Sequence, residues 1–81
     1  MKVRVLLFAA YREAAGVSSL EVELSDEATA SDLFDLLEAS YSGLRVLRPY
    51  TSFAVNREVV DGRLRLKPGD EVAFLQPVSG G

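Results

Sequence analysis

The sequence ends in Pro77, Val78, Ser79, Gly80 and Gly81, and the α-carboxylate of Gly81 is the group in this chain best suited to chemistry. A carboxylate is ionised at neutral pH. It is a poor electrophile, so acyl chemistry at Gly81 requires activation by another enzyme, for instance as an acyl-adenylate. Two residues without Cβ atoms would let the tail thread a narrow channel. We therefore treat residues 77–81 as a candidate reactive tail, with a frayed, functionless end as the alternative.

The other side chains offer little for catalysis. The chain contains no cysteine and no histidine, which removes thiolate nucleophiles, disulfides, the usual general base and the commonest metal ligand. No GxGxxG or GxxxxGK motif signals a phosphate-binding loop. We expect no metal site and no cofactor bound by this chain.

The charges are mixed, with twelve acidic and nine basic residues and a net charge of -3. Nucleic acid is not an expected partner, because phosphate binding relies on clustered basic residues. We expect solvated or capping roles for the charged groups, which are Arg45 with Arg48, Arg63 with Arg65 and Lys67, Asp26-Glu27, Asp32 with Asp35, and Asp70-Glu71. No stretch is apolar for long enough to span a bilayer, and Met1 leads directly into a strand-like pattern, so the expected location is cytoplasmic.

The elements that must position the tail follow from hydrophobic periodicity. Alternation predicts a strand over 2–8 and a second over 18–25, joined by a short helix or turn that stops at Gly16. A helix is predicted from about Ser31 to Ser40, with Thr29 or Ser31 as N-cap and Gly43 as a stop. Further strands are predicted at 53–55, 59–60 and 71–76, with turns at Asn56-Arg57, 61–62 and 67–70.

This order of elements predicts an α+β fold, the β-grasp, with a mixed sheet packed against one main helix. A chain of 81 residues that is 48% hydrophobic makes one domain, here residues 1–76, followed by a flexible tail at 77–81. The first and last strands should lie side by side at the sheet centre, because both are strongly apolar.

The strand phase has a consequence for binding. If Val3, Val5, Leu7, Val72 and Phe74 face the helix, then Leu6, Phe8 and Leu75 face away from it. An apolar patch on an uncovered sheet face commonly marks a partner site. The alternative is that a loop covers Phe8 or Leu75.

Several segments carry a resemblance. The segments "VRVLLFAAYREAAG", "ATASDLFDLLEASYSGL", "AVN" and "LKPGDEVAFLQPVSGG" resemble, from end to end, the small subunits of molybdopterin synthase. These are ubiquitin-like sulfur carriers of the MoaD/ThiS family, related to the thiamine-pathway sulfur carrier. The resemblance implies that a ubiquitin-activating-like adenylyltransferase uses ATP to adenylate the Gly81 carboxylate, and that a sulfur donor then converts it to a thiocarboxylate.

The resemblance also implies a partner. Residues 77–80 would insert with Gly81 into the large synthase subunit, where the sulfur passes to cyclic pyranopterin monophosphate in molybdenum cofactor biosynthesis. The small subunit would thus donate sulfur without being catalytic, with the active site on the large subunit and a heterotetramer of two small subunits on a central dimer of large ones. Phe8, Val59 and Leu75 match the family's docking surface.

Other functions remain open at this stage. The same tail would serve a sulfur carrier for thiazole or another metabolite, a ubiquitin-like protein modifier, or a plain interaction domain. One position departs from expectation: Arg57 follows Asn56 in a predicted turn, where a positive φ would favour Gly.

Overall fold

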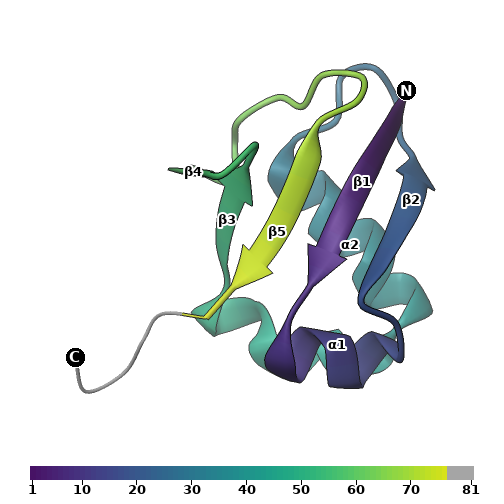
Figure 1. Cartoon of the computed structure of the whole chain (residues 1–81), viewed down its shortest axis with the longest axis vertical. Coiled ribbons are helices and arrows are strands. Elements are labelled where there is room, and N and C mark those ends of the chain that lie inside the picture. Colours follow the sequence, from purple (N-terminus) through teal and green to yellow (C-terminus); the bar gives the residue numbers. More distant parts are fainter. Residues whose placement is uncertain (77–81) are drawn as a thin grey trace.

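The computed structural model describes residues 1–76, which form a mixed five-stranded sheet with its helices on one face and at one end (Figure 1). The predictions made for residues 77–81 lie outside the described residues. No helix among residues 1–76 has the length and apolar character needed to cross a membrane. The elements, in chain order, are β1 (Lys2–Leu7), α1 (Ala9–Ala15), β2 (Ser19–Glu23), α2 (Ala30–Ser40), the 3-10 helix η1 (Ser42–Tyr50), β3 (Ser52–Val55), β4 (Glu58–Val60) and β5 (Glu71–Leu75).

The first and last strands form the centre of the sheet, as the sequence predicts. The strand order is β2-β1-β5-β3-β4, and β1 runs parallel to β5 with Val5 opposite Val72 and Leu7 opposite Phe74. Strand β2 pairs antiparallel with β1, and β3 pairs antiparallel with β5. Because β1 and β5 are parallel, both end at the same edge of the molecule.

Both predicted helices form, and local capping explains their ends. Helix α1 stops at Gly16, whose φ of 78° is left-handed and whose N–H donates to the Arg12 carbonyl. Helix α2 begins after Thr29, whose hydroxyl accepts from the Asp32 N–H while the Asp32 carboxylate accepts from the Thr29 N–H. Gly43 is not the stop of α2; it lies inside η1.

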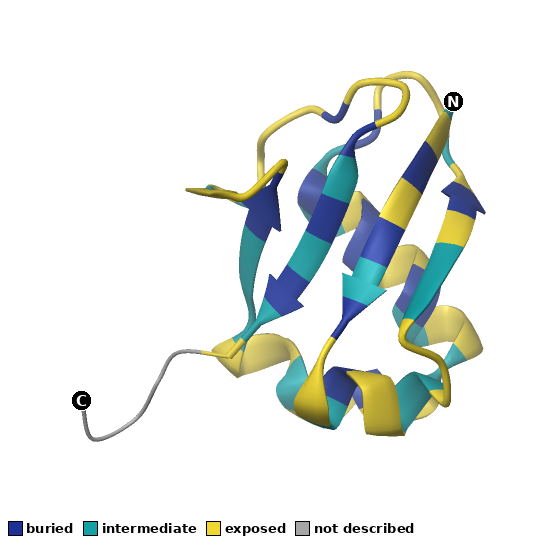
Figure 2. Cartoon of the chain, viewed as in Figure 1, coloured by how far each residue is buried: buried dark blue, intermediate teal, exposed yellow. Residues whose placement is uncertain are grey.

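The core lies between the sheet and α2, and alternate strand residues point into it (Figure 2). This confirms the predicted strand phase, since the five residues expected to face the helix are all buried: Val3, Val5, Leu7, Val72 and Phe74. The Phe74 ring is central, with its centroid 5.0 Å from that of Phe34, 5.7 Å from Phe53 and 5.9 Å from Tyr11. Offset and edge-to-face contacts of this kind stabilise the core beyond the area that they bury.

Tyr11 anchors α1 in the core, because its side chain is buried. Its hydroxyl hydrogen-bonds the Thr51 hydroxyl at 2.8 Å, which satisfies the polar end inside the core. A short amphipathic helix with one buried aromatic residue therefore closes the end of the sheet.

The segment Ser42–Tyr50 has no predicted structure, and it forms η1. Contacts distant in sequence hold it in place. The Arg48 guanidinium donates to Glu38, 2.8 Å away, and to Asp35, and lies 4.9 Å from the centre of the Phe34 ring. Arg48 is therefore paired rather than free in solvent, which differs from its expected solvated role.

The turn between β3 and β4 is tied to the start of β5. The Asn56 side chain donates to the Asp70 carboxylate at 2.9 Å and accepts from the Glu71 N–H at 3.0 Å. Asp70 also accepts from the Lys67 N–H and is buried, unlike the solvated turn residue that the sequence indicates. Asn56 and Arg57 have φ angles of 51° and 73°, as in a type I′ hairpin turn.

The strain at Arg57 gives a first prediction. We expect Arg57→Gly to raise the free energy of unfolding by about 1 kcal/mol, because glycine adopts a positive φ without steric cost. For a domain of this size, that is a rise in Tm of about 4–8 °C. Arg57→Ala is the matched control, since it removes the same side chain but keeps the strain. Thermal unfolding followed by circular dichroism measures both, and equal Tm values for the two variants would contradict the assignment of strain to this turn.

Candidate functional site

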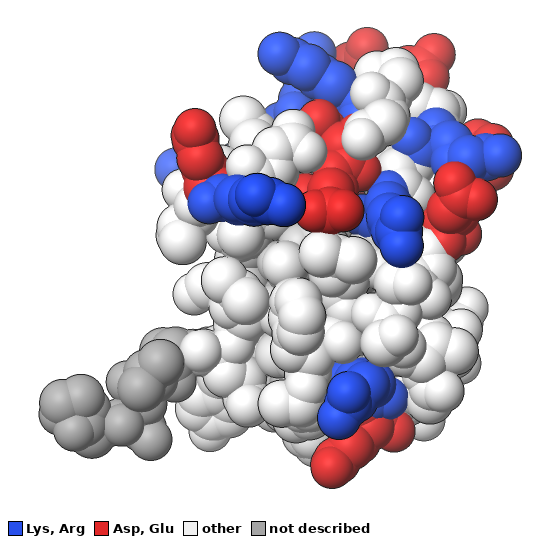
Figure 3. All heavy atoms as spheres, viewed as in Figure 1, with Lys and Arg blue, Asp and Glu red and all other residues white. Residues whose placement is uncertain are grey.

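One face of the sheet is left uncovered by the helices, and we call it the open face. It carries the outward row Val59, Ala54, Ala73 and Leu6, because these residues are paired in register across β4, β3, β5 and β1. Figure 3 shows this face: uncharged side chains form a broad band over the middle and lower strands. The band is the apolar patch that the strand phase predicts.

Two of the three predicted docking residues meet at the end of β5. Phe8 is 51% exposed, and it lines a hollow of about 350 Å³ together with Leu75 and Gln76. The backbone turns sharply here, because Ala9 has a φ of 48°. Within residues 1–76 no loop covers Phe8, and Leu75 is only half-buried. The tail that begins at Pro77 therefore follows directly from an exposed apolar site.

Val59, the third predicted docking residue, lies at the β4 edge of the same face. Its side chain is 75% exposed, and its register partner is Ala54. It does not line the hollow beside Phe8. The structure thus places Phe8 and Leu75 together and leaves Val59 apart on the same surface. Their docking role stays a prediction.

A second hollow on the open face has no counterpart in the sequence-based reading. Its volume is about 290 Å³, and it lies between the apolar band and the charged part of the face. The alanine pair at its floor, Ala54 opposite Ala73 in register, is the signal that could have revealed it, since two small residues side by side leave a depression. The residues that line it are Leu6, Phe8, Ala54, Arg57, Glu71 and Ala73.

The open face becomes charged toward the start of β1. Arg4 lies opposite Glu21 on β2 and opposite Glu71 on β5, and Lys2 lies opposite Glu23. Cross-strand pairs of opposite charge are mildly stabilising. Charged side chains gather at this end of the face in Figure 3, so the face is divided into an apolar half beside the tail and a half of alternating charge.

The perturbed pKa values belong to structural ion pairs away from this face. Hydrogen bonds from Arg48 to Glu38 and then to Asp35 raise the pKa of the Arg48 guanidinium. Hydrogen bonds from the Arg63 side chain and backbone lower the pKa of Asp61 to about 2, and the same pair raises the pKa of Arg63. None of these groups lines either hollow, so the shifts do not mark a catalytic centre among residues 1–76.

The described residues contain no cluster of possible metal ligands. No group of three or more carboxylate, histidine or cysteine side chains comes together within residues 1–76. Gly81 and the preceding tail residues, on which the sequence places the chemistry, lie outside the described part of the chain. What the structure describes is an exposed apolar surface at the end of β5.

The fold defines the class. A mixed sheet with parallel central strands, packed on one face against α2, is the β-grasp of ubiquitin-like proteins, as predicted. The particular assignment comes from the sequence: the chain belongs to the ThiS family, which it matches over residues 5–81.

Relatives and solved structures agree with this assignment. The chain is 41% identical to the molybdopterin synthase sulfur carrier subunit of Chlamydomonas reinhardtii, and the alignment covers 100% of each protein. SAMP1 of Haloferax volcanii is 30% identical, with a TM-score of 0.84 and 100% coverage of both chains. The complex of subunits 1 and 2 of the molybdopterin-converting factor of Helicobacter pylori contains a chain that is 23% identical, with a TM-score of 0.70 and 100% coverage of both chains, which is a likeness of fold alone.

Proposed function

We propose that this chain is the sulfur carrier subunit of molybdopterin synthase. The observation that carries the proposal is the alignment over the full length of a relative with that name, at 41% identity. The alignment covers all of this chain, including its last residue Gly81, and β5 ends at Leu75, at the apolar end of the open face. The absence of cysteine from the sequence is compatible with this role, because the sulfur would be carried on the terminal carbonyl.

The proposed cycle begins with activation of Gly81. A ubiquitin-activating-like adenylyltransferase joins the carboxylate to AMP from ATP and releases pyrophosphate. Sulfur at the oxidation level of HS⁻ then attacks the acyl carbon and displaces AMP, and loss of the S–H proton leaves a thiocarboxylate. The new group is a better nucleophile than the carboxylate, because sulfur is more polarisable and less strongly hydrated. This chain contributes the acyl group and a docking surface, and the adenylyltransferase binds the nucleotide.

Transfer takes place on the partner. Residues 77–81 enter the large subunit, and the Gly81 sulfur bonds to a carbon of cyclic pyranopterin monophosphate and displaces an oxygen substituent from it. Water then cleaves the bond between the Gly81 carbonyl and the sulfur, which leaves the sulfur on the pterin and returns Gly81 to the carboxylate. Two such transfers supply the two sulfur atoms of the dithiolene, so two thiocarboxylated carriers are consumed for each molybdopterin. The assembly is proposed to be a heterotetramer with a central dimer of large subunits. The cytoplasmic location expected from the sequence remains a prediction.

Reconstitution tests this function. The thiocarboxylated chain is mixed with the large subunit of the same organism and cyclic pyranopterin monophosphate, and the product is measured by mass spectrometry. We expect molybdopterin, with two carriers returned to the carboxylate form for each product molecule. Sulfur transfer to a thiazole synthase but not to the large synthase subunit would instead establish the thiazole alternative.

A second function is favoured by a specific observation. The likeness to SAMP1 covers all of both chains, and a solved H. volcanii protein of this kind is called small archaeal modifier protein 1. A modifier would form isopeptide bonds between Gly81 and lysine side chains of other proteins. Mass spectrometry of tryptic digests from cells that express the chain would detect such linkages, and their presence would extend the function beyond sulfur transfer.

A further inference from the structure

The second hollow is a preformed recess lined by four apolar residues and two charged ones. Ala54 and Ala73 form its floor, opposite each other in register, while Leu6 and Phe8 form an apolar wall. Its volume of about 290 Å³ is roughly ten times the volume that one water molecule occupies in the liquid. It is therefore large enough to take one large side chain. Apolar surface of this kind gains free energy when a partner covers it.

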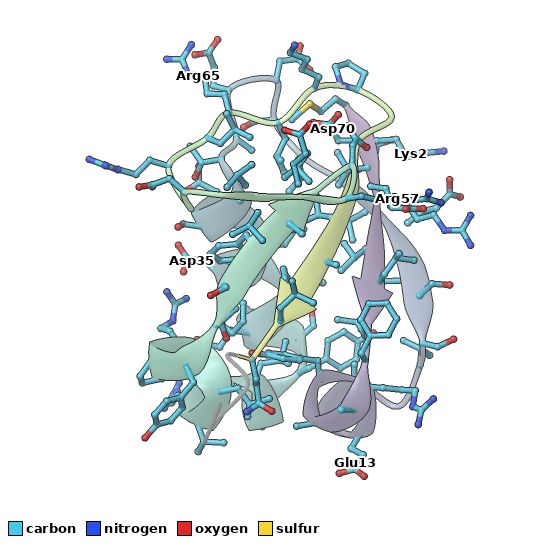
Figure 4. All side chains as sticks on the ribbon, turned by 60° about the vertical axis from the view of Figure 1, so that its left-hand side comes forward. Lys2, Glu13, Asp35, Arg57, Arg65 and Asp70 are labelled. Carbon is cyan, nitrogen blue, oxygen red and sulfur yellow. The ribbon has the colours of Figure 1, made fainter. Side chains whose placement is uncertain are left out.

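Arg57 lies at the border of this hollow and is held there at a conformational cost. Figure 4 shows Arg57 at the turn end of the β3–β4 hairpin, close to the beginning of β5. Its φ of 73° lies in the left-handed region, where residues other than glycine and asparagine are strained. The fold gains no burial from it, since Arg57 is exposed. Strain that brings no packing is a reason to look for a role in binding.

The charge of Arg57 is also available. The ion pairs within residues 1–76 engage Arg45, Arg48, Arg63 and Arg65, and Arg57 takes part in none of them. Glu71 lines the same hollow, but it lies opposite Arg4 in the β1–β5 register. Neither Glu71 nor Arg57 takes part in an ion pair within residues 1–76, so no carboxylate of these residues engages the guanidinium of Arg57. A planar guanidinium is well suited to bind a carboxylate.

We propose that the hollow receives one large apolar side chain of the partner and that Arg57 binds a carboxylate beside it. The partner is the large synthase subunit, so this inference rests on the proposed function. The partner's apolar side chain supplies the buried contact. The ion pair between Arg57 and the partner's carboxylate determines which partner surfaces bind. Arg57 is thus a specificity-determining residue of the docking surface, distinct from the contacts made by Phe8 alone.

Filling the hollow tests the first half of this proposal. Ala73→Leu places an aliphatic side chain in the space meant for the partner, and we expect the Kd for the large subunit to rise at least about 10-fold, as for an overpacked contact. The matched control is Ala39→Leu, which adds the same atoms at an exposed position of α2. Calorimetric titration of the full chain measures both. An unchanged or tighter Kd for Ala73→Leu overturns the proposal, because a flat apolar contact would gain from the added side chain.

Changing the charge at the border tests the second half. We expect Arg57→Glu to raise the Kd at least about 10-fold and Arg57→Lys to raise it by about threefold or less, because lysine keeps the charge but loses the planar fork. The salt dependence of the Kd should be weaker for Arg57→Gly than for the unmodified chain. Equal affinity of Arg57→Glu and the unmodified chain overturns the role of Arg57.

The controls separate this inference from the proposed function. If the unmodified chain does not bind the large subunit, both the proposed function and this inference fail. If the unmodified chain binds and supports molybdopterin formation while the variants bind equally well, only the inference fails. Sedimentation of the free chain adds one further outcome: a dimer that Ala73→Leu dissociates would show that a second copy occupies the hollow, which also overturns the proposal.

Discussion

A chain that lacks Gly81 is expected to support no molybdopterin formation in the complete system of activating enzyme, sulfur donor and large subunit. The deletion moves the terminal carboxyl group back by one residue, which is about 3.5 Å of extended chain. Reactions that depend on positioning lose about 100-fold in rate for a displacement of 1 Å. The expected result is therefore a loss of product below detection.

The deletion should leave the domain intact. Thermal unfolding of the shortened chain is expected to match that of the unmodified chain, because the core consists of residues between Val3 and Phe74. Gly81→Ala is the control for length, since it keeps the carboxyl group in place and adds a methyl group. We expect it to retain measurable activity. Full molybdopterin formation by the deletion variant would rule out Gly81 as the carrier residue.

The second large effect is expected at Phe8. Phe8→Glu should raise the Kd for the large subunit at least about 100-fold, because exposed aromatic residues at the centre of an interface often contribute more than 2 kcal/mol and a buried carboxylate would also have to lose its hydration. The fold should persist, since Phe8 is already 51% exposed. Calorimetric titration gives the affinity, and circular dichroism reports the fold.

Leu36→Glu is the matched control for Phe8→Glu. Leu36 is an apolar residue of similar exposure, at 44%, and it belongs to α2 on the other side of the sheet. We expect this variant to bind the large subunit with unchanged affinity. If Phe8→Glu unfolds the chain, Phe8 belongs to the core and the strand phase is wrong. If both variants lose binding equally, the open face is not the docking surface.

Much of the fold is readable from periodicity. The alternation of Val3, Val5 and Leu7 predicts which face of β1 is buried, and the same reasoning for Val72 and Phe74 leaves Phe8 and Leu75 outside; the structure confirms both. The Thr29 cap is readable for a similar reason, since a hydroxyl three residues before an acidic side chain acts within one helical turn. These signals are local, so a single sequence contains them.

The features that sequence reading missed depend on contacts distant in the chain. Helix η1 contains Pro49, which usually interrupts a helix, and Arg48 holds it to α2 through Glu38 and the Phe34 ring. Tyr11 is buried because Thr51, forty positions away, satisfies its hydroxyl. Neither contact has a signature in the neighbouring residues.

The candidate site shows the same division. Phe8 and Leu75 follow from strand phase, whereas the hollow over Ala54 and Ala73 requires the register between β3 and β5. The sequence indicates that Arg57 is unfavourable in a turn that needs a positive φ. Only the structure gives that φ and places Arg57 beside the hollow.

The most direct test of sulfur carriage is the intact mass of the chain after incubation with ATP, the adenylyltransferase and a sulfur source. We predict a mass increase equal to the exchange of one oxygen atom for one sulfur atom, located by fragmentation to Gly81 and absent without ATP. No increase in the unmodified chain, or the same increase in the chain that lacks Gly81, would contradict the proposed role.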